Sequence, residues 1–335
     1  HVGRIKAEQI LPPMVGPAWG YRFRARLSVR HVPRKGGVLV GFHERGSSYV
    51  ADMQECHVLP QRVSQLLLPL RALVESLSLR DRLPQIEVAM GDDRLALVLR
   101  ILQPLLPEDE DRLNAFATRH SVDFWLQTGG PDKIQPFGTT PATGLSYAMP
   151  EFGLRMPFRP TDFTQVNHAV NAVLVSRALG LLEPQAHDRL ADLFCGLGNF
   201  TLPMATRARE VLGLEGSATL VDRAREGAKA HGLDGKARFD VANLFELGLE
   251  RWNALGRFDR VLVDPPREGA QAIAQVLSHP EASRPQRVVY VSCNPATLAR
   301  DAAIMVHEGR WRLRQAGVVN MFPHTAHVES IAVFE

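Results

Sequence analysis

Short runs of alternating apolar and polar residues dominate the first 150 positions, and turn-forming residues separate them. Residues 21–30 (YRFRARLSVR) place arginine at almost every second position, which predicts a strand with one basic face. Gly36 and Gly37 lie between this run and the next apolar run, so we expect a hairpin there. Two more strands and two helices are expected at 86–90, 95–99, 61–79 and 107–120. This mixture of elements predicts an α+β domain.

From about residue 186 the pattern changes to apolar runs that alternate with helical segments. Such alternation predicts a parallel, doubly wound sheet with helices on its faces, as in Rossmann-like folds. We expect five strands at 189–194, 210–215, 237–242, 258–263 and 287–292, with helices between them such as 218–231 and 295–307. Two further strand-like runs, 311–320 and 328–334, are joined by a short link without a helix, so they should pair antiparallel.

The change of pattern divides the 335 residues into two domains, each long enough to bury a core. We expect the α+β domain to span residues 21–160 and the doubly wound α/β domain to span residues 161–335. The first twenty residues form a separate segment, which we expect to pack on the second domain.

Composition narrows the class of protein. No apolar run approaches 18 residues, which predicts that the chain has no membrane span, and no signal-peptide pattern opens it. Three cysteines in a long chain argue against a disulfide scaffold and predict a reducing compartment, the cytoplasm.

The positive charge gathers near the N-terminus. Residues 1–35 hold eight Lys or Arg residues against a single acid, Glu8, although the whole chain has a net charge of only +3. Arginines along one strand face, with aromatic residues beside them, suit a phosphate backbone. A solvated sheet face explains the same pattern equally well, so both interpretations stay open.

A glycine pair follows the first strand of the α/β domain. In residues 192–200 (DLFCGLGNF) two glycines let the backbone turn tightly and approach a ligand. Glu215 ends the next strand, where a carboxylate can bind the two hydroxyls of a ribose. The third glycine of the dinucleotide motif is missing, because Leu202 and Pro203 follow. The pattern therefore favours an adenosine ligand without a pyrophosphate, such as S-adenosylmethionine, over NAD.

Three reactive side chains stand at other strand ends. Asp264 follows the fourth strand, Cys293 follows the fifth, and Glu329 begins the last strand. Ligands of open α/β sheets bind beyond the carboxyl ends of the strands. An antiparallel last strand begins at that same edge, so we expect these three residues and Glu215 to converge.

Cys293 stands where a buried strand gives way to a helix. Asn294 can cap that helix and Pro295 suits its first position, so Cys293 would lie at a helix N-terminus, which favours a thiolate. An inert buried cysteine is the alternative. In a methyl-donor fold, a thiolate can add to carbon 6 of uracil and make carbon 5 nucleophilic toward the sulfonium methyl group. A carboxylate such as Glu329 can then remove the proton at carbon 5, before the thiolate leaves by elimination. A uracil held inside RNA would first have to be flipped out of its stack.

With these motifs the sequence resembles the RNA (uracil-5)-methyltransferase family over nearly its whole length. It is most similar to the bacterial branch that methylates a uridine of 23S ribosomal RNA with S-adenosylmethionine, which implies an RNA-binding α+β domain beside a class I methyltransferase domain. The matching stretches are 163–167 (FTQVN), 192–196 (DLFCG), 264–265 (DP), 292–295 (SCNP) and 321–325 (MFPHT) with Glu329. The resemblance implies that Cys293 is the nucleophile and Glu329 the proton-abstracting base. It further implies that six residues bind the methyl donor or position the base: Gln165, Phe194, Asn199, Glu215, Asn243 and Asp264.

Two of these residues also have simpler interpretations. Gln165 is singled out by the resemblance alone, since a Gln in such a stretch is usually a surface residue. Asn243 precedes a helical run and could be only a helix cap.

The ribosomal branch carries a four-iron cluster on four cysteines, and the chain departs from that pattern. Cys56 matches the fourth ligand, while Cys195 and Cys293 belong to the α/β domain. The N-terminal barrel of the branch has no counterpart either. Either this chain, which opens with His1, is part of a longer protein, or its lineage lost the cluster. A 4Fe-4S cluster is expected only in a longer chain.

Four functions compete. We favour methylation of 23S ribosomal RNA to 5-methyluridine by a monomer, because residues 41–48 (GFHERGSS) and Cys56 match that branch. The same chemistry on tRNA is the alternative, and an RNA-binding protein with an inactive methyltransferase fold is another. A DNA cytosine-5 enzyme would have proline before its nucleophile, where Ser292 stands.

Overall fold

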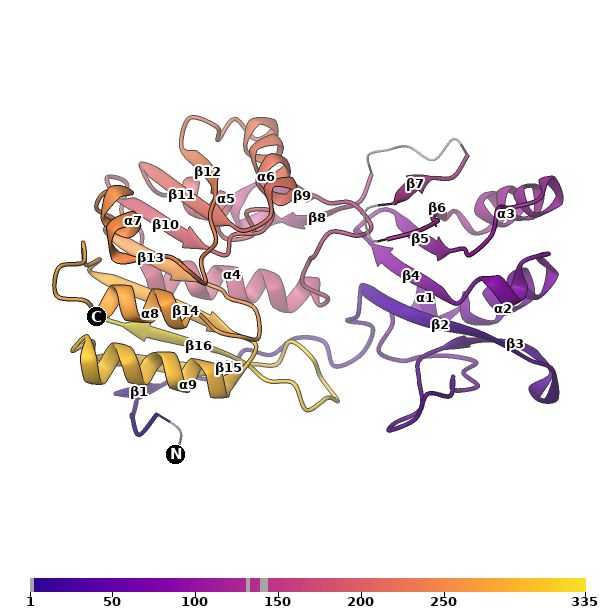
Figure 1. Cartoon of the computed structure of the whole chain (residues 1–335), viewed down its shortest axis with the longest axis horizontal. Coiled ribbons are helices and arrows are strands. Elements are labelled where there is room, and N and C mark those ends of the chain that lie inside the picture. Colours follow the sequence, from indigo (N-terminus) through magenta and orange to yellow (C-terminus); the bar gives the residue numbers. More distant parts are fainter. Residues whose placement is uncertain (1–2, 131–132, 139–143) are drawn as a thin grey trace. The chain divides into compact units, whose positions relative to one another are not determined.

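The computed structural model describes residues 3–130, 133–138 and 144–335, and the chain forms two compact units (Figure 1). Unit 1 comprises His1–Gly16, Met149–Met156 and Ala169–Glu335, and unit 2 comprises Pro17–Ala148 and Pro157–His168. This division differs from a single boundary near residue 160. The segment before Pro17 belongs to unit 1, and residues 157–168 belong to unit 2.

Unit 2 is built on a six-stranded sheet with the order β3-β2-β4-β5-β6-β7. Its strands are β2 (Arg24–Val32), β3 (Gly37–Gly41), β4 (Gln85–Met90), β5 (Leu95–Arg100), β6 (Asp123–Gln127) and β7 (Ile134–Pro136). Helices α1 (Gln61–Ser64), α2 (Leu67–Ser76) and α3 (Pro107–His120) accompany it. Leucines and valines of α2 share one apolar core with the inward residues of β2, β4 and β5. A separate two-stranded sheet pairs β8 (Ser146–Met149) with β9 (Leu154–Pro157).

The alternating pattern of residues 21–30 forms a strand with two unlike faces, as predicted. Leu27 and Val29 are buried in the core, whereas Arg26 and Arg30 are exposed on the other face. The predicted hairpin joins β2 to β3, and Gly36 has a φ of 87°, in the left-handed region that glycine adopts without strain. One arginine of this face is already engaged, because Arg26 forms an ion pair with Glu87 on β4.

Unit 1 is built on an eight-stranded sheet with the order β1-β15-β16-β14-β13-β10-β11-β12. Its strands are β1 (Gln9–Ile10), β10 (Arg189–Leu193), β11 (Glu210–Glu215), β12 (Ala237–Val241), β13 (Arg260–Val263), β14 (Arg287–Ser292), β15 (Leu313–Val319) and β16 (Glu329–Phe334). The five central strands β10 to β14 are parallel, and β16 is antiparallel to both β14 and β15, as predicted. β10 lies between β11 and β13, so the strand order reverses there, which is where such sheets bind ligands.

Helices of unit 1 lie against this sheet (Figure 1). They are α4 (His168–Leu182), α5 (Thr201–Ala205), α6 (Ala218–Ala230), α7 (Leu249–Ala254), α8 (Gln271–Ser278) and α9 (Pro295–Ala303). Trp252 of α7, Ile273 of α8 and Leu298 of α9 share a core with β10, β13 and β14. In the part of the chain that the structure describes, no helix is long and apolar enough to cross a bilayer.

The N-terminal segment is fixed to unit 1 by a short edge strand. β1 runs parallel to β15, with Gln9 opposite Gln315. The Glu8 carboxylate accepts hydrogen bonds from the guanidinium groups of Arg312 and Arg314.

Candidate active site

The strand ends of unit 1 bring three side chains to one edge of the sheet. Val263 and Ser292, which precede Asp264 and Cys293, end the parallel strands β13 and β14. β16 runs the opposite way and pairs Ser330 with Ser292. Its first residue, Glu329, therefore lies beside Cys293. The order predicted from the sequence therefore places a thiol and two carboxyl groups together.

Hydrogen bonds on both sides of Cys293 hold it in a tight turn. The Ser292 hydroxyl accepts a bond from the Asn294 N–H (3.1 Å) and lies 3.0 Å from the Asn294 carbonyl oxygen, to which it can donate. Asn294 Oδ1 accepts a bond from the Ala296 N–H (3.1 Å), and Pro295 occupies the first position of α9. Cys293 is half-buried at this helix N-terminus.

The charges around Cys293 oppose its ionisation. Burial raises the pKa of the Cys293 thiol, and the carboxyl groups of Glu329 and Asp264 raise it further, whereas Arg267 lowers it. The helix N-terminus was expected to favour a thiolate. Burial and the two carboxyl groups outweigh that effect, because like charges in a low-dielectric site repel strongly.

Both carboxyl groups have pKa values near neutral pH. Burial raises the pKa of Glu329 to about 8, with a contribution from Asp264, and burial raises the pKa of Asp264 to about 7. Glu329 is only 4% exposed, and its Oε2 atom has no hydrogen-bond partner among the described residues. A carboxylate with such a pKa is a stronger base than an ordinary one, which suits removal of a proton from carbon.

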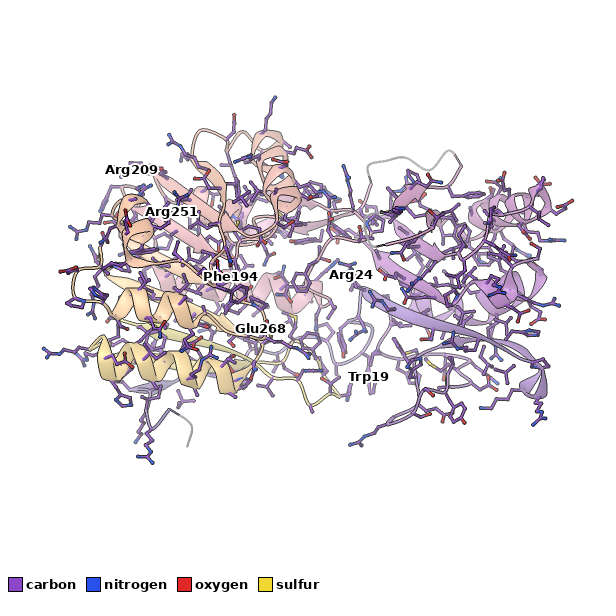
Figure 2. The ribbon with its side chains drawn as sticks, viewed as in Figure 1. Trp19, Arg24, Phe194, Arg209, Arg251 and Glu268 are labelled. Carbon is purple, nitrogen blue, oxygen red and sulfur yellow. The ribbon has the colours of Figure 1, made fainter. Side chains whose placement is uncertain are left out.

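A second group of residues surrounds the end of β10, near the glycine pair. Phe194 has a φ of 66°, which is uncommon outside glycine, and its N–H donates to the Leu214 carbonyl. The Glu215 carboxylate accepts one hydrogen bond from the Gly196 N–H (3.1 Å) and another from the Ser217 N–H (3.0 Å). Phe194 follows β10 and Glu268 follows β13, and Figure 2 shows both at the same end of the sheet.

This surrounding fits an adenosine-containing methyl donor. A Cβ added to Gly196 would meet no atom within 4 Å, so there is open space beside the glycine that Glu215 binds. The rings of Phe194 and Phe245 lie 5.4 Å apart, and Phe245 is 50% exposed. Two aromatic faces at this end of the sheet could stack on an adenine, and the Glu215 carboxylate could accept hydrogen bonds from a ribose.

Two residues near this group were missed from the sequence. Phe245 gave no signal, because a lone Phe after a strand is usually part of the core. Asn171 on α4 is buried, and its side-chain amide exchanges two hydrogen bonds with that of Asn199 (2.9 and 3.0 Å). The glycine-rich turn is thus fixed to α4 by a residue that no motif indicated.

The remaining predicted residues are placed as follows. Asn243 is exposed, and its Oδ1 accepts a bond from the Phe245 N–H (3.2 Å). Gln165 belongs to unit 2. The roles proposed for both remain predictions.

The described residues around Cys56 do not form a metal site. It is half-buried in unit 2, and its N–H donates to the Ser64 hydroxyl (2.8 Å). Among the described residues, no group of three or more His, Cys, Asp or Glu side chains could hold a metal ion. Cys195 and Cys293 belong to unit 1. A four-iron cluster needs four ligands, usually thiolates, so the described residues do not fit one.

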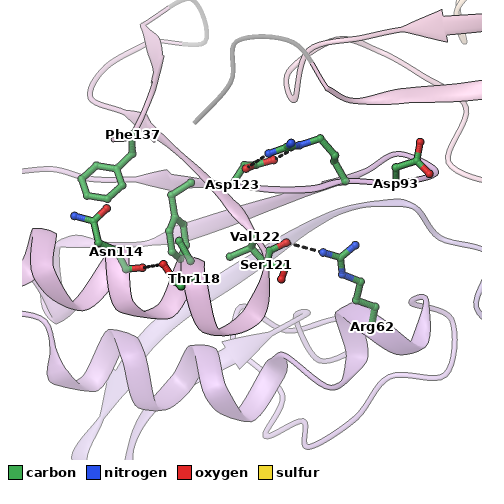
Figure 3. A pocket seen from close by; sticks show the side chains of 11 residues that line it. Arg62, Asp93, Asn114, Thr118, Ser121, Val122, Asp123 and Phe137 are labelled. Carbon is green, nitrogen blue, oxygen red and sulfur yellow. Dashed lines mark hydrogen bonds and ion pairs between the residues drawn. The ribbon is translucent and has the colours of Figure 1, made fainter. Parts of the chain in front are cut away.

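Unit 2 contains a polar pocket of about 490 Å³ (Figure 3). Arg94 forms two hydrogen bonds with Asp123, and Arg62 donates to the Ser121 carbonyl (2.6 Å). These charged groups already have partners within the pocket wall, so they are structural ties rather than a second reactive centre.

Comparison with known proteins identifies the family of the chain. The family described as tRNA (Uracil-5-)-methyltransferase matches residues 152–335. The 23S rRNA (uracil(1939)-C(5))-methyltransferase RlmD of Bordetella bronchiseptica is 65% identical, over all of this chain and 72% of that protein. The protein of the same name from Burkholderia thailandensis is 60% identical, over all of this chain and 73% of its own length.

A solved structure shares the fold. The Pyrococcus abyssi tRNA (uracil-54, C5)-methyltransferase in complex with S-adenosyl-L-homocysteine superposes with a TM-score of 0.76 at 22% identity, covering 98% of this chain and 78% of that one. The predicted Rossmann-like methyltransferase fold is confirmed. The chain belongs to the RNA (uracil-5)-methyltransferase family that its motifs indicated.

Proposed function

We propose that this protein transfers a methyl group from S-adenosylmethionine to carbon 5 of a uridine in 23S ribosomal RNA. The observation that carries the proposal is the convergence of three side chains at the edge of the sheet where the parallel strands end: Cys293, Asp264 and Glu329. The names of relatives at 60–65% identity support the choice of ribosomal RNA. We expect a cytoplasmic monomer, and the three free cysteines suit a reducing compartment.

In the proposed mechanism the donor supplies a methyl group activated by a sulfonium. Phe194, Glu215 and Asn243 would hold its adenosine, and Asn199 would support the glycine-rich turn. Cys293 adds as thiolate to carbon 6 of the uracil ring, and Asp264 hydrogen-bonds the polar edge of the ring. Once carbon 5 carries the methyl group, Glu329 removes the proton from that carbon. As that proton leaves, the bond from carbon 6 to the Cys293 sulfur breaks, which releases the thiolate and restores the double bond between carbons 5 and 6.

The same chemistry on tRNA is the second candidate. The family description and the similar Pyrococcus abyssi structure both name tRNA enzymes, so this substrate requires a direct test. The basic face of β2 would then contact a different RNA, and the active-site residues of unit 1 would act as described above.

The test traps the covalent intermediate. RNA fragments from 23S ribosomal RNA and whole tRNA, each with 5-fluorouridine in place of uridine, are incubated with protein and S-adenosylmethionine. Fluorine at carbon 5 cannot leave as a proton, so the adduct persists and mass spectrometry locates it. We expect an adduct on Cys293 with the ribosomal fragment, lost in Cys293→Ala and retained in Cys195→Ala. An adduct with tRNA alone would select the second candidate, and no adduct with either RNA would contradict both.

A further inference from the structure

The loop after β13 is fixed to α9 along its length. This loop, residues 264–270, starts at Asp264, and five of its hydrogen bonds with α9, its cap or β14 involve the loop backbone, including one from the Thr297 hydroxyl to the Arg267 carbonyl (3.3 Å). Asn294 Nδ2 donates to the Arg267 carbonyl (3.0 Å), and Arg300 donates to the Glu268 carbonyl (2.9 Å). The Ala270 N–H donates to Asp301 Oδ2 (2.7 Å) and also lies 3.0 Å from the Tyr290 hydroxyl. The loop and α9 therefore form one hydrogen-bonded element.

The loop backbone also packs directly on the helix. Gly269 has a φ of 78°, and a Cβ on it would come within 2.9 Å of Arg300, Asp301 and Thr297. Only a residue without a side chain lets the loop approach this closely. The distance between the loop and residues 297–301 of α9 is thus short and leaves little freedom.

One side chain joins this element to the nucleophile. The Asn294 carboxamide uses both of its ends. Oδ1 caps α9 through the Ala296 N–H (3.1 Å), and Nδ2 holds the Arg267 carbonyl. Cys293 is the neighbour of Asn294, and Asp264 and Arg267 belong to the loop. After burial and Glu329, the same two loop residues are the next charges that act on the Cys293 thiol.

We propose that Asn294 is a positioning residue for methyl transfer, whose amide holds the Asp264 loop in register with the Cys293 thiol. This inference rests on the proposed function. An ordinary helix cap needs only an acceptor, and serine serves that purpose as well as asparagine. The Nδ2 donor is what the positioning role requires, so the two roles can be separated by substitution.

The test uses Asn294→Ser with a matched control. Serine keeps a cap acceptor and removes the amide donor. Asn253 is the control, because its Nδ2 donates to the Glu281 carbonyl (3.0 Å) and its Oδ1 accepts from the Ser283 N–H (2.8 Å), at the end of α7. Asn253→Ser therefore also loses an amide donor bond to a loop carbonyl, together with its acceptor bond, outside the nucleophile's turn. The rate of adduct formation with 5-fluorouridine RNA, the affinity for that RNA and the thermal midpoint are measured for both variants.

We expect Asn294→Ser to slow adduct formation by about tenfold to a hundredfold, since small misplacements of reacting groups have effects of that size. Its RNA affinity and its thermal midpoint should match those of Asn253→Ser, whose adduct rate stays at the wild-type level. Wild-type kinetics in Asn294→Ser would overturn the proposal. If Asn294→Ser does not fold, Asn294→Asp replaces it, because aspartate is also a good cap and lacks the donor.

A second readout separates this inference from the proposed function. Absence of any adduct in the wild-type protein would contradict the proposed function and leave the kinetic comparison without a reference. Hydrogen exchange of the Gly269 and Ala270 amides then decides. Faster exchange in Asn294→Ser than in Asn253→Ser supports the positioning role, and equal exchange overturns it.

Discussion

Glu329 is deeply buried, and its Oε2 atom has no hydrogen-bond partner in the described part of the chain. These two features determine what its replacement should do. In Glu329→Gln the amide cannot accept the proton from carbon 5, whereas Cys293 can still add to carbon 6. We expect covalent protein–RNA complexes to accumulate even when the RNA carries ordinary uridine instead of 5-fluorouridine. Release of methylated RNA should slow at least about a hundredfold. Denaturing gels of the complex and counting of released methylated RNA measure the two steps. Ser330→Ala is the neighbouring control, and rapid release in Glu329→Gln would rule out Glu329 as the base.

The pKa of about 8 at Glu329 predicts how the release of methylated RNA depends on pH. Burial makes the protonated form persist through neutral pH, so the base form appears only as pH rises through about 8. Release of product should therefore rise about tenfold per pH unit below that value and level off above it. In Glu329→Gln the residual release should lack this rise. A release rate that falls with increasing pH would contradict the assignment.

Cys293 and Asp264 could be found from the sequence because each follows an apolar strand directly. Their position depends only on local order and on the rule that parallel strands end together. Asn171 and Phe245 could not be found in this way. Asn171 matters through a contact with Asn199, 28 residues along the chain, and no local pattern encodes that pairing.

Among the elements, the junction of α8, α9 and β14 depends on one buried acid. Asp301 is fully buried and accepts hydrogen bonds from the Ala270 N–H and the Tyr290 hydroxyl. Asp301→Ala removes the acceptor of the Tyr290 hydroxyl and leaves the Ala270 N–H with the Tyr290 hydroxyl alone, so we expect the free energy of unfolding to fall by about 3 kcal/mol. Urea denaturation measures this change. The control is Asp222→Ala on α6, which removes an exposed pair with Arg225 and should change stability by less than about 1 kcal/mol. Equal effects of the two variants would refute the role of Asp301.

Individual strands were predictable where both faces of the strand are buried. The expected strands at 210–215 and 287–292 match β11 and β14 residue for residue, because parallel strands are continuous apolar runs. The two-residue strand β1 was not predictable, since Gln9 and Ile10 form it only through pairing with β15, some 300 residues away.

At the scale of the whole molecule, the chain passes between its two units four times. The pattern of hydrophobic and polar residues revealed the change from α+β to α/β elements. It could not reveal that residues 149–156 belong to one unit and residues 157–168 to the other, because both segments are short and their membership depends on long-range packing.

This division predicts where the methyl donor should stabilise the protein. S-adenosylmethionine at a hundred times its Kd should raise the stability of the unit that binds it by about 2.7 kcal/mol, since it binds the folded form alone. The glycine-rich turn and Glu215 both belong to unit 1. Hydrogen exchange should therefore slow at the Phe194 and Gly196 amides, whereas the core strands of unit 2 exchange at their original rates. Glu215→Ala should abolish the effect, because the variant lacks the carboxylate expected to bind the ribose hydroxyls. Equal protection of both units, or undiminished protection in Glu215→Ala, would show that the donor binds elsewhere.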